Sequence, residues 1–132
     1  MRKYIITYLG AIAAFAAVDA VWLTQVGPNL YRPTLDPVLA DQPDLVTAVV
    51  FYLAYILGTV VLVVVPARSL GHAARTGAIL GAMCYATYDL TNQATLKVWS
   101  LHITLIDISW GTFLTATTAA VAYLVLSRFT PK

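Results

Sequence analysis

Charged side chains are scarce in this sequence of 132 residues. Only 11% of the residues are Asp, Glu, Lys or Arg, whereas 60% are hydrophobic, and the mean hydropathy is +0.78. A soluble domain carries about 25% charged residues, so this chain has too little charge to cover a soluble globule. The net charge of +2 is small and dispersed, which argues against a nucleic-acid partner. The composition therefore predicts an integral membrane protein.

Several residue types that build familiar sites are also rare or missing. All six acidic residues are aspartates, and the chain has one cysteine and two histidines. The single Cys84 cannot form an internal disulfide, and too few histidines and cysteines are present for the usual zinc sites. The sequence contains no phosphate-binding loop or nucleotide fingerprint. We therefore expect neither a metal nor a cofactor.

Four apolar stretches are long enough to cross a membrane as helices. They cover about residues 4–23, 45–65, 76–96 and 103–126, and a membrane helix needs about 20 such residues. The second and fourth stretches are rich in β-branched residues, but isolated strands cannot satisfy their backbone hydrogen bonds in lipid. The sequence thus predicts an all-α fold, a four-helix bundle that forms a single transmembrane domain over residues 1–132.

The basic residues predict how these helices are oriented. Six lysines and arginines lie at the chain ends or between the second and third stretches, and two lie in the other loops. Because positively charged loops stay in the cytoplasm, we expect both termini to be cytoplasmic in a multi-pass protein of the inner membrane. The one long loop, residues 24–44, contains four prolines that divide it into short turns. The short loop 97–102 makes the last two helices an antiparallel hairpin.

Three aspartates, Asp19, Asp89 and Asp107, fall within the predicted membrane helices. An aspartate at the centre of such a helix costs about 2.5–3.5 kcal/mol on insertion scales. The helical rise places these residues roughly 6–10 Å below the outer boundary of the hydrocarbon core. The three carboxyl groups are therefore expected to converge at one level, in the outer third of the membrane.

Polar and aromatic side chains share this level. A period of 3.6 places two tyrosines and Asn92 on the stripe of Asp89, and Trp22 and Trp110 each lie about one turn from an aspartate. Trp99 is assigned to the interfacial aromatic belt. Gly77 and Gly81 form a small-residue pair that favours close packing, either within the bundle or between protomers. We predict an outward-facing cup with an apolar floor, whose ligand-binding residues are Asp19, Trp22, Tyr52, Tyr85, Tyr88, Asp89, Asn92, Asp107 and Trp110. The sequence leaves catalytic residues unassigned.

Three motifs carry a resemblance to a known family. Residues 85–92 read YATYDLTN and are followed by Ala94, Leu96 and Trp99, residues 107–111 read DISWG, and residues 19–23 read DAVWL. These motifs resemble the signature of a bacterial family of small four-span membrane proteins that is catalogued as a domain of unknown function. The resemblance covers nearly the whole chain. It implies a compact inner-membrane protein in which these polar motif residues recur, and it implies no established activity.

The aspartate cluster has two interpretations. Three neighbouring carboxyl groups in a low dielectric cannot all stay ionised, which favours a binding or reaction site, with one aspartate donating a proton and another accepting it. Such a set could also attract a hard cation through its oxygen atoms. In the other interpretation, hydrogen bonds from these side chains only hold the membrane helices together.

Three functions compete on this evidence. The first is binding of a lipid or small apolar molecule in the cup, and whether a reaction follows stays open. The second is a proton-coupled transporter that acts as a homodimer, because the size and span number resemble the small multidrug resistance transporters. Those transporters carry a glutamate near the midplane, whereas this chain has aspartates in the outer third. The third is a structural or assembly protein without chemistry.

Overall fold

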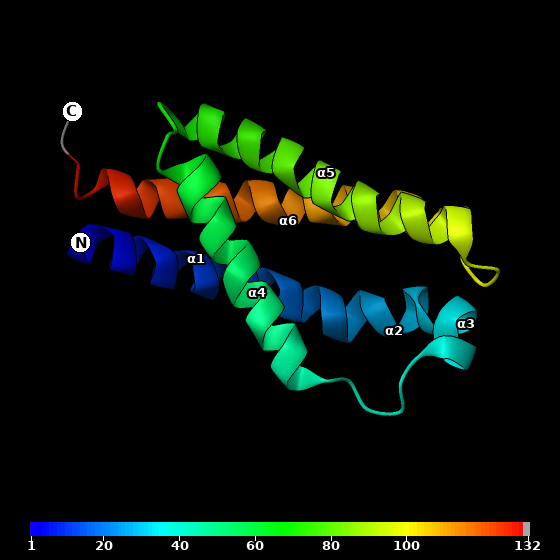
Figure 1. Cartoon of the computed structure of the whole chain (residues 1–132). Coiled ribbons are helices and arrows are strands. Elements are labelled where there is room, and N and C mark those ends of the chain that lie inside the picture. The colour runs from blue at the N-terminus through cyan, green and yellow to red at the C-terminus, as the bar shows by residue number, and fades with distance from the viewer. Residues whose placement is uncertain (131–132) are drawn as a thin grey trace.

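A computed structural model describes residues 1–130, which contain helices and no strand. Helix α1 (Arg2–Val21) runs through a π-helical turn, η1 (Trp22–Val26), into the short α2 (Gly27–Leu30). The one-turn α3 (Arg32–Leu35) and a 3-10 turn, η2 (Asp36–Val38), follow. Helix α4 (Leu45–Thr59) ends in a second π-helical turn, η3 (Val60–Val64), before α5 (Leu70–Thr95) and α6 (Leu101–Ser127) (Figure 1). The predicted all-α fold is confirmed.

Polar side chains define where the later long helices begin. The Asp44 carboxylate accepts a hydrogen bond from the backbone N–H of Thr47 at 3.1 Å and so caps α4. The hydroxyl groups of Ser69 and Ser100 cap α5 and α6 in the same way, each bonding the N–H group three residues later. These caps satisfy backbone donors that have no partner inside the helix. The turns that separate the helices are thus encoded locally.

The first helical segment is longer than the sequence predicted. The prediction ended it near residue 23 and began a loop at residue 24, whereas the helical path continues to Leu30. Pro28 lies in the first turn of α2, where a proline loses no required hydrogen bond. This proline therefore continues the segment after the π-helical turn instead of ending it.

Among the described residues, three stretches are long and apolar enough to cross a membrane: Arg2–Leu30, Leu45–Val64 and Leu101–Ser127. Helix α5 has 26 residues, which is also sufficient length, but it carries more polar side chains. That α5 also crosses the membrane, in addition to these three stretches, stays a prediction. Of the polar residues of α5, Asp89 is buried, whereas Thr87, Thr91 and Thr95 are exposed.

Helices α5 and α6 lie side by side and antiparallel, as predicted, and α1 packs along α6 (Figure 1). Helix α4 crosses the other long helices obliquely and diverges from α5 toward its own N-terminal end. The N-terminus and the end of α6 lie at the same end of the molecule. This agrees with an even number of crossings, and the assignment of that end to the cytoplasm stays a prediction.

The predicted small-residue pair brings α5 and α6 together within one chain. A Cβ atom on Gly77 would lie 2.8 Å from the Cβ of Ala119 and 2.9 Å from the carbonyl oxygen of Thr115. A Cβ atom on Gly81 would lie 2.7 Å from the Thr115 hydroxyl oxygen. Both positions exclude a larger side chain, so the pair packs inside the fold.

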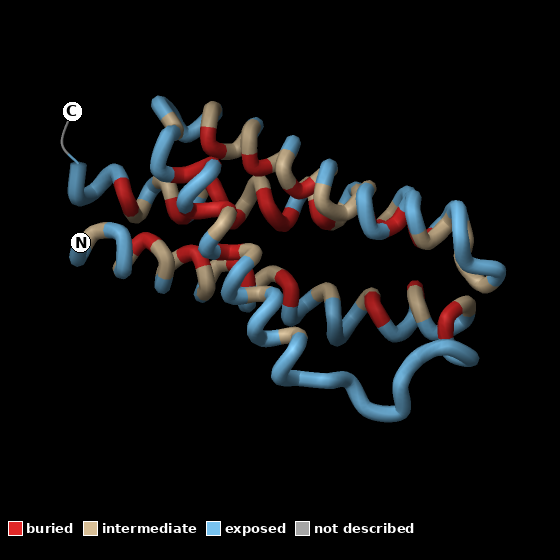
Figure 2. The backbone as a smooth tube through the Cα atoms, viewed as in Figure 1, coloured by how far each residue is buried: buried red, intermediate tan, exposed pale blue. Residues whose placement is uncertain are grey.

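The apolar core occupies the half of the molecule that holds the termini. Phe15 of α1, Ile56 of α4 and Leu114 of α6 belong to one buried cluster there, with several valines of η3. Figure 2 shows the buried residues on the facing sides of α1, α5 and α6, whereas the start of α4 and the segment before it are exposed. The buried aspartates lie farther along, and two of them, Asp19 and Asp107, line a cavity.

Candidate functional site

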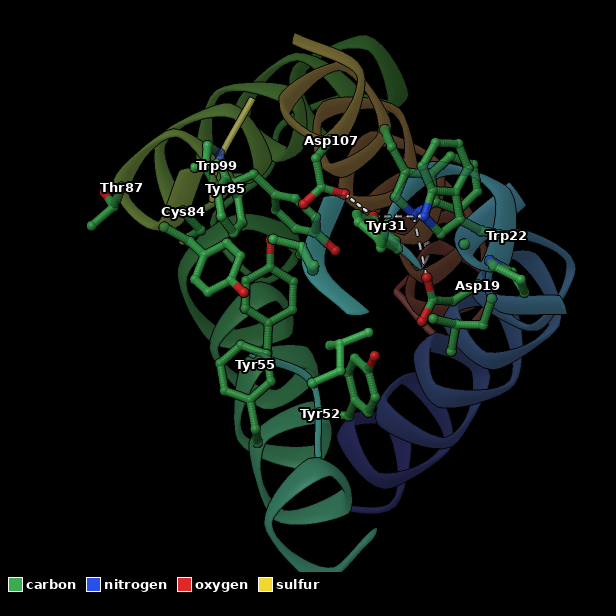
Figure 3. Close-up of a pocket in the computed structure, with 18 of the residues that line it drawn as sticks. Asp19, Trp22, Tyr31, Tyr52, Tyr55, Cys84, Tyr85, Thr87, Trp99 and Asp107 are labelled. Carbon is green, nitrogen blue, oxygen red and sulfur yellow. Dashed lines mark hydrogen bonds between the residues drawn. The ribbon is translucent and has the colours of Figure 1, made fainter. Parts of the chain in front are cut away.

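A cavity of about 1010 Å³ lies between α1, α4, α5 and α6 and is bordered by the α2–α3 segment (Figure 3). Aromatic rings make up much of its wall, and all three tryptophans of the chain take part. Two aspartates, Asp19 and Asp107, supply its acidic groups, and Arg32 supplies a basic group. The space is therefore large and mostly apolar, with a few polar groups, which is the usual character of a small-molecule site.

A chain of side-chain contacts, which we call the aspartate–aromatic chain, runs along the wall. The indole N–H of Trp110 donates to the Asp19 carboxylate at 3.3 Å, and the Trp110 ring stacks on Trp22. The indole N–H of Trp22 donates to the Tyr31 hydroxyl oxygen at 3.0 Å. The Tyr31 O–H donates to the Asp107 carboxylate. Both cavity aspartates therefore accept a hydrogen bond from an aromatic side chain (Figure 3).

The α2–α3 segment is held against the bundle around Tyr31. Leu30 and Leu35, on either side of this tyrosine, are buried in a cluster with Ile103 of α6. Burial raises the pKa of the Tyr31 hydroxyl, and the neighbouring Asp107 carboxylate raises it further. The phenol therefore stays protonated at neutral pH, as its donor role requires. The segment borders the cavity as a fixed element.

Asp89 lies at the α5–α6 contact and is fully buried. Its carboxyl group is next to that of Asp107, yet neither of its oxygen atoms has a hydrogen-bond partner within residues 1–130. A Cβ atom on Gly111 would overlap the Tyr85 ring, so this glycine makes room for the ring beside the carboxyl pair. Two adjacent carboxyl groups away from water require a proton or a cation between them.

The cavity is open on the side between α4 and α5. On the α4 side its wall includes the exposed ring of Phe51, and on the α5 side it includes Thr87, Tyr88 and Thr91, which are also exposed. This opening coincides with the divergence of α4 from α5 (Figure 1). Helix α4, at this opening, belongs to one of the stretches that are long and apolar enough to cross a membrane.

Most of the site residues predicted from the sequence meet at this cavity. Seven of them line it: Asp19, Trp22, Tyr52, Tyr85, Tyr88, Asp107 and Trp110. Asp89 and Asn92 are not among the lining residues. Helix α5 turns Asp89 toward α6, and Asn92, one turn from Tyr88, is only partly buried. The helical period placed these two residues on one stripe with Tyr85 and Tyr88 but could not show how the helix is rotated.

Sequence reasoning missed several residues of the wall. Tyr31 and Arg32 come from the segment predicted as a loop, and Trp99 lines the cavity although it was assigned to the interfacial belt. The Trp99 indole N–H donates to the Thr104 hydroxyl at 3.0 Å, and its ring contacts Tyr88 edge-on, 5.6 Å between centroids. These contacts hold the ring against the bundle. The two aromatic residues in the stretch 22–31, Trp22 and Tyr31, were an available but unspecific signal.

The chain belongs to the family described as predicted membrane protein (DUF2177), which matches residues 4–124. The match includes every residue of the aspartate–aromatic chain. No curated protein and no solved structure shows significant similarity to this chain. The family identifies the chain as a membrane protein and assigns no role to the cavity.

Proposed function

We propose that this member of the family binds a membrane lipid or a small apolar molecule in the cavity between α4 and α5. The observation that carries this proposal is a largely aromatic cavity that opens beside the apolar helix α4 and contains two hydrogen-bonded aspartates. Its volume of about 1010 Å³ is at the upper end of the roughly 300–1,000 Å³ of typical ligand sites. This size suits a long or two-chained ligand.

The predicted membrane topology supports a lipid over a water-soluble ligand. With both termini in the cytoplasm, the cavity lies in the outer half of an inner membrane, where lipid chains are at high concentration. A ligand entering between Phe51 and Thr87 would exchange one apolar environment for another and gain aromatic contacts at little cost in desolvation. Its polar end would meet the polar side chains of the cavity wall, which include Asp19, Asp107 and Arg32. Acid–base chemistry on that end would use one aspartate as proton donor and the other as acceptor.

Native mass spectrometry of the full chain in mild detergent tests this proposal. The delipidated protein is mixed with equal amounts of dioleoyl phosphatidylethanolamine, phosphatidylglycerol and diacylglycerol. We expect one or two bound lipids that survive gentle activation, and less bound lipid in Thr87→Trp, which narrows the opening. Thr95→Trp is the matched control, because both threonines are exposed on α5 and bond a carbonyl four residues earlier.

Two results would count against the proposal. If the wild type retains no lipid, the cavity does not hold this class of ligand. If Thr87→Trp and Thr95→Trp retain as much lipid as the wild type, the bound lipid lies elsewhere on the surface. Intrinsic fluorescence gives an independent measurement, because Trp22, Trp99 and Trp110 all line the cavity. Binding inside it is expected to shift their emission.

Proton-coupled transport is the second candidate, and Asp89 is the observation that favours it. A fully buried carboxyl group that has no hydrogen-bond donor among residues 1–130 and lies next to Asp107 suits a site that takes up and releases a proton. Proteoliposomes with an imposed pH gradient and a fluorescent organic cation test this candidate. Transport that stops in Asp89→Asn would support it, and equal flux in empty and protein-containing vesicles would remove it.

A further inference from the structure

Arg32 is the only basic side chain among the described residues that line the cavity. It lies at the end of the molecule opposite the termini, on α3, next to Tyr31. Within residues 1–130 no carboxylate lies within 4.0 Å of its guanidinium group as an ion-pair partner. The two cavity aspartates instead accept hydrogen bonds from Trp110 and Tyr31. Arg32 therefore offers an unpaired positive charge to whatever occupies the cavity.

The guanidinium group is carried by a backbone that the fold holds in place. Tyr31, the preceding residue, contacts both Trp22 and Asp107 through its hydroxyl group. Leu35, one turn after Arg32, is buried against Ile103. An exposed arginine on a free loop loses much of its binding energy to the entropy of ordering the loop. Here that ordering is already achieved by the neighbours of Arg32.

The cavity thus has two different ends. The opening between α4 and α5 is bordered by aromatic rings and threonines at the level of the apolar segments, whereas Arg32 lies beyond the end of the first apolar span, Arg2–Leu30. A two-chained lipid with a charged head group has the same separation of apolar and charged parts. Arginine binds phosphate oxygens through two parallel N–H donors, so its charge complements a phosphodiester head group.

We infer that the ligand of this cavity is an anionic phospholipid, whose acyl chains enter between α4 and α5 and whose phosphate pairs with Arg32. This inference rests on the proposed lipid-binding function and specifies the head group. A zwitterionic lipid carries the same phosphate, but its ammonium group cancels the net charge that Arg32 attracts. A neutral diacylglycerol offers Arg32 no charged partner. A preference among these three lipids therefore tests the role of Arg32. Binding of any one of them tests whether the cavity holds lipid at all.

Competition in native mass spectrometry tests the inference. The full chain in mild detergent is given equal amounts of dioleoyl phosphatidylglycerol, phosphatidylethanolamine and diacylglycerol. We expect the wild type to prefer phosphatidylglycerol by about tenfold, the equivalent of one charge-assisted hydrogen bond. Arg32→Gln is expected to lose this preference while still binding lipid, and Arg32→Lys, which keeps the charge, to retain part of it.

Lys97→Gln is the matched control, because it removes one positive charge from an exposed residue at the same end of the molecule, outside the cavity wall. It should keep the preference for phosphatidylglycerol. The inference is overturned if the wild type binds the three lipids equally, or if Arg32→Gln and Lys97→Gln change the preference to the same extent. Absence of any bound lipid in the wild type would instead overturn the proposed lipid-binding function itself.

Discussion

The indole rings of Trp22 and Trp110 stack face to face, with 4.3 Å between their centroids and 7° between their planes. Their N–H groups serve different partners, since Trp110 donates to Asp19 and Trp22 donates to Tyr31. The stack therefore joins the end of α1 to α6 across the cavity wall. Aromatic pairs of this kind contribute about 0.5–1.5 kcal/mol beyond the area they bury. Through Tyr31, the stack is also connected to Asp107.

Replacing Tyr31 by phenylalanine should destabilise the α2–α3 segment. The change removes the hydroxyl group that donates to Asp107 and accepts from Trp22, and it leaves both groups without their partner. We expect a loss of about 1–3 kcal/mol, measured as a lower midpoint of thermal unfolding in detergent. Tyr4→Phe is the control, since Tyr4 is exposed on α1. Equal midpoints for the two variants would contradict a stabilising role for the Tyr31 hydroxyl.

Alkaline pH should weaken the same contact. Burial and the Asp107 carboxylate hold the pKa of Tyr31 above its ordinary value, which is about 10. The folded state thus binds this proton more tightly than the unfolded state. Its contribution to stability is complete below about pH 10 and declines as the pH rises above that value. The unfolding midpoint of the wild type should therefore fall more steeply above about pH 10 than that of Tyr31→Phe. Parallel curves would show that another group is responsible.

The contact between α5 and α6 should not tolerate a methyl group at Gly81. A Cβ atom there would lie 2.7 Å from the Thr115 hydroxyl oxygen, so the helices would have to separate. Overpacking of this kind costs about 1–3 kcal/mol, and we expect Gly81→Ala to lower the unfolding midpoint. The matched change Gly58→Ala in α4 meets no atom within 4 Å and should raise stability by up to about 1 kcal/mol. If Gly81→Ala were as stable as Gly58→Ala, α5 and α6 would not approach each other as closely at Gly81 as the structure shows.

Asp89→Asn should preserve or raise stability. The carboxyl group of Asp89 is fully buried, has no hydrogen-bond partner within the described residues, and lies next to Asp107. An amide has the same shape, carries no charge, and its NH₂ group can donate to the Asp107 carboxylate. The measurement is the unfolding midpoint at neutral pH, with Asp89→Leu as the comparison that removes all polar atoms. Unfolding or aggregation of Asp89→Asn would indicate that the carboxylate itself holds α5 against α6.

The three aspartates of the membrane helices have unequal surroundings, although the sequence placed them at one level. Asp19 and Asp107 each have an aromatic donor, whereas Asp89 has none among residues 1–130. Helical spacing shows which residues share a stripe, but the rotation of α5 depends on how it packs. Gly77 and Gly81 set that rotation by directing one face of α5 against α6. Asp89 is consequently part of the helix contact, and Tyr85 and Tyr88 are part of the cavity.

The sequence by itself determined the class of the protein, its apolar helices, the antiparallel pair α5–α6 and both aspartates of the cavity wall. These properties follow from local quantities: hydropathy over about 20 residues, the 3.6-residue period and short connections. Only the tertiary structure decided that Tyr31, Arg32 and Trp99 border the cavity. These residues lie outside the long regular helices, where periodicity gives no direction. Their positions come from contacts with residues distant in sequence, such as the bond from Tyr31 to Asp107.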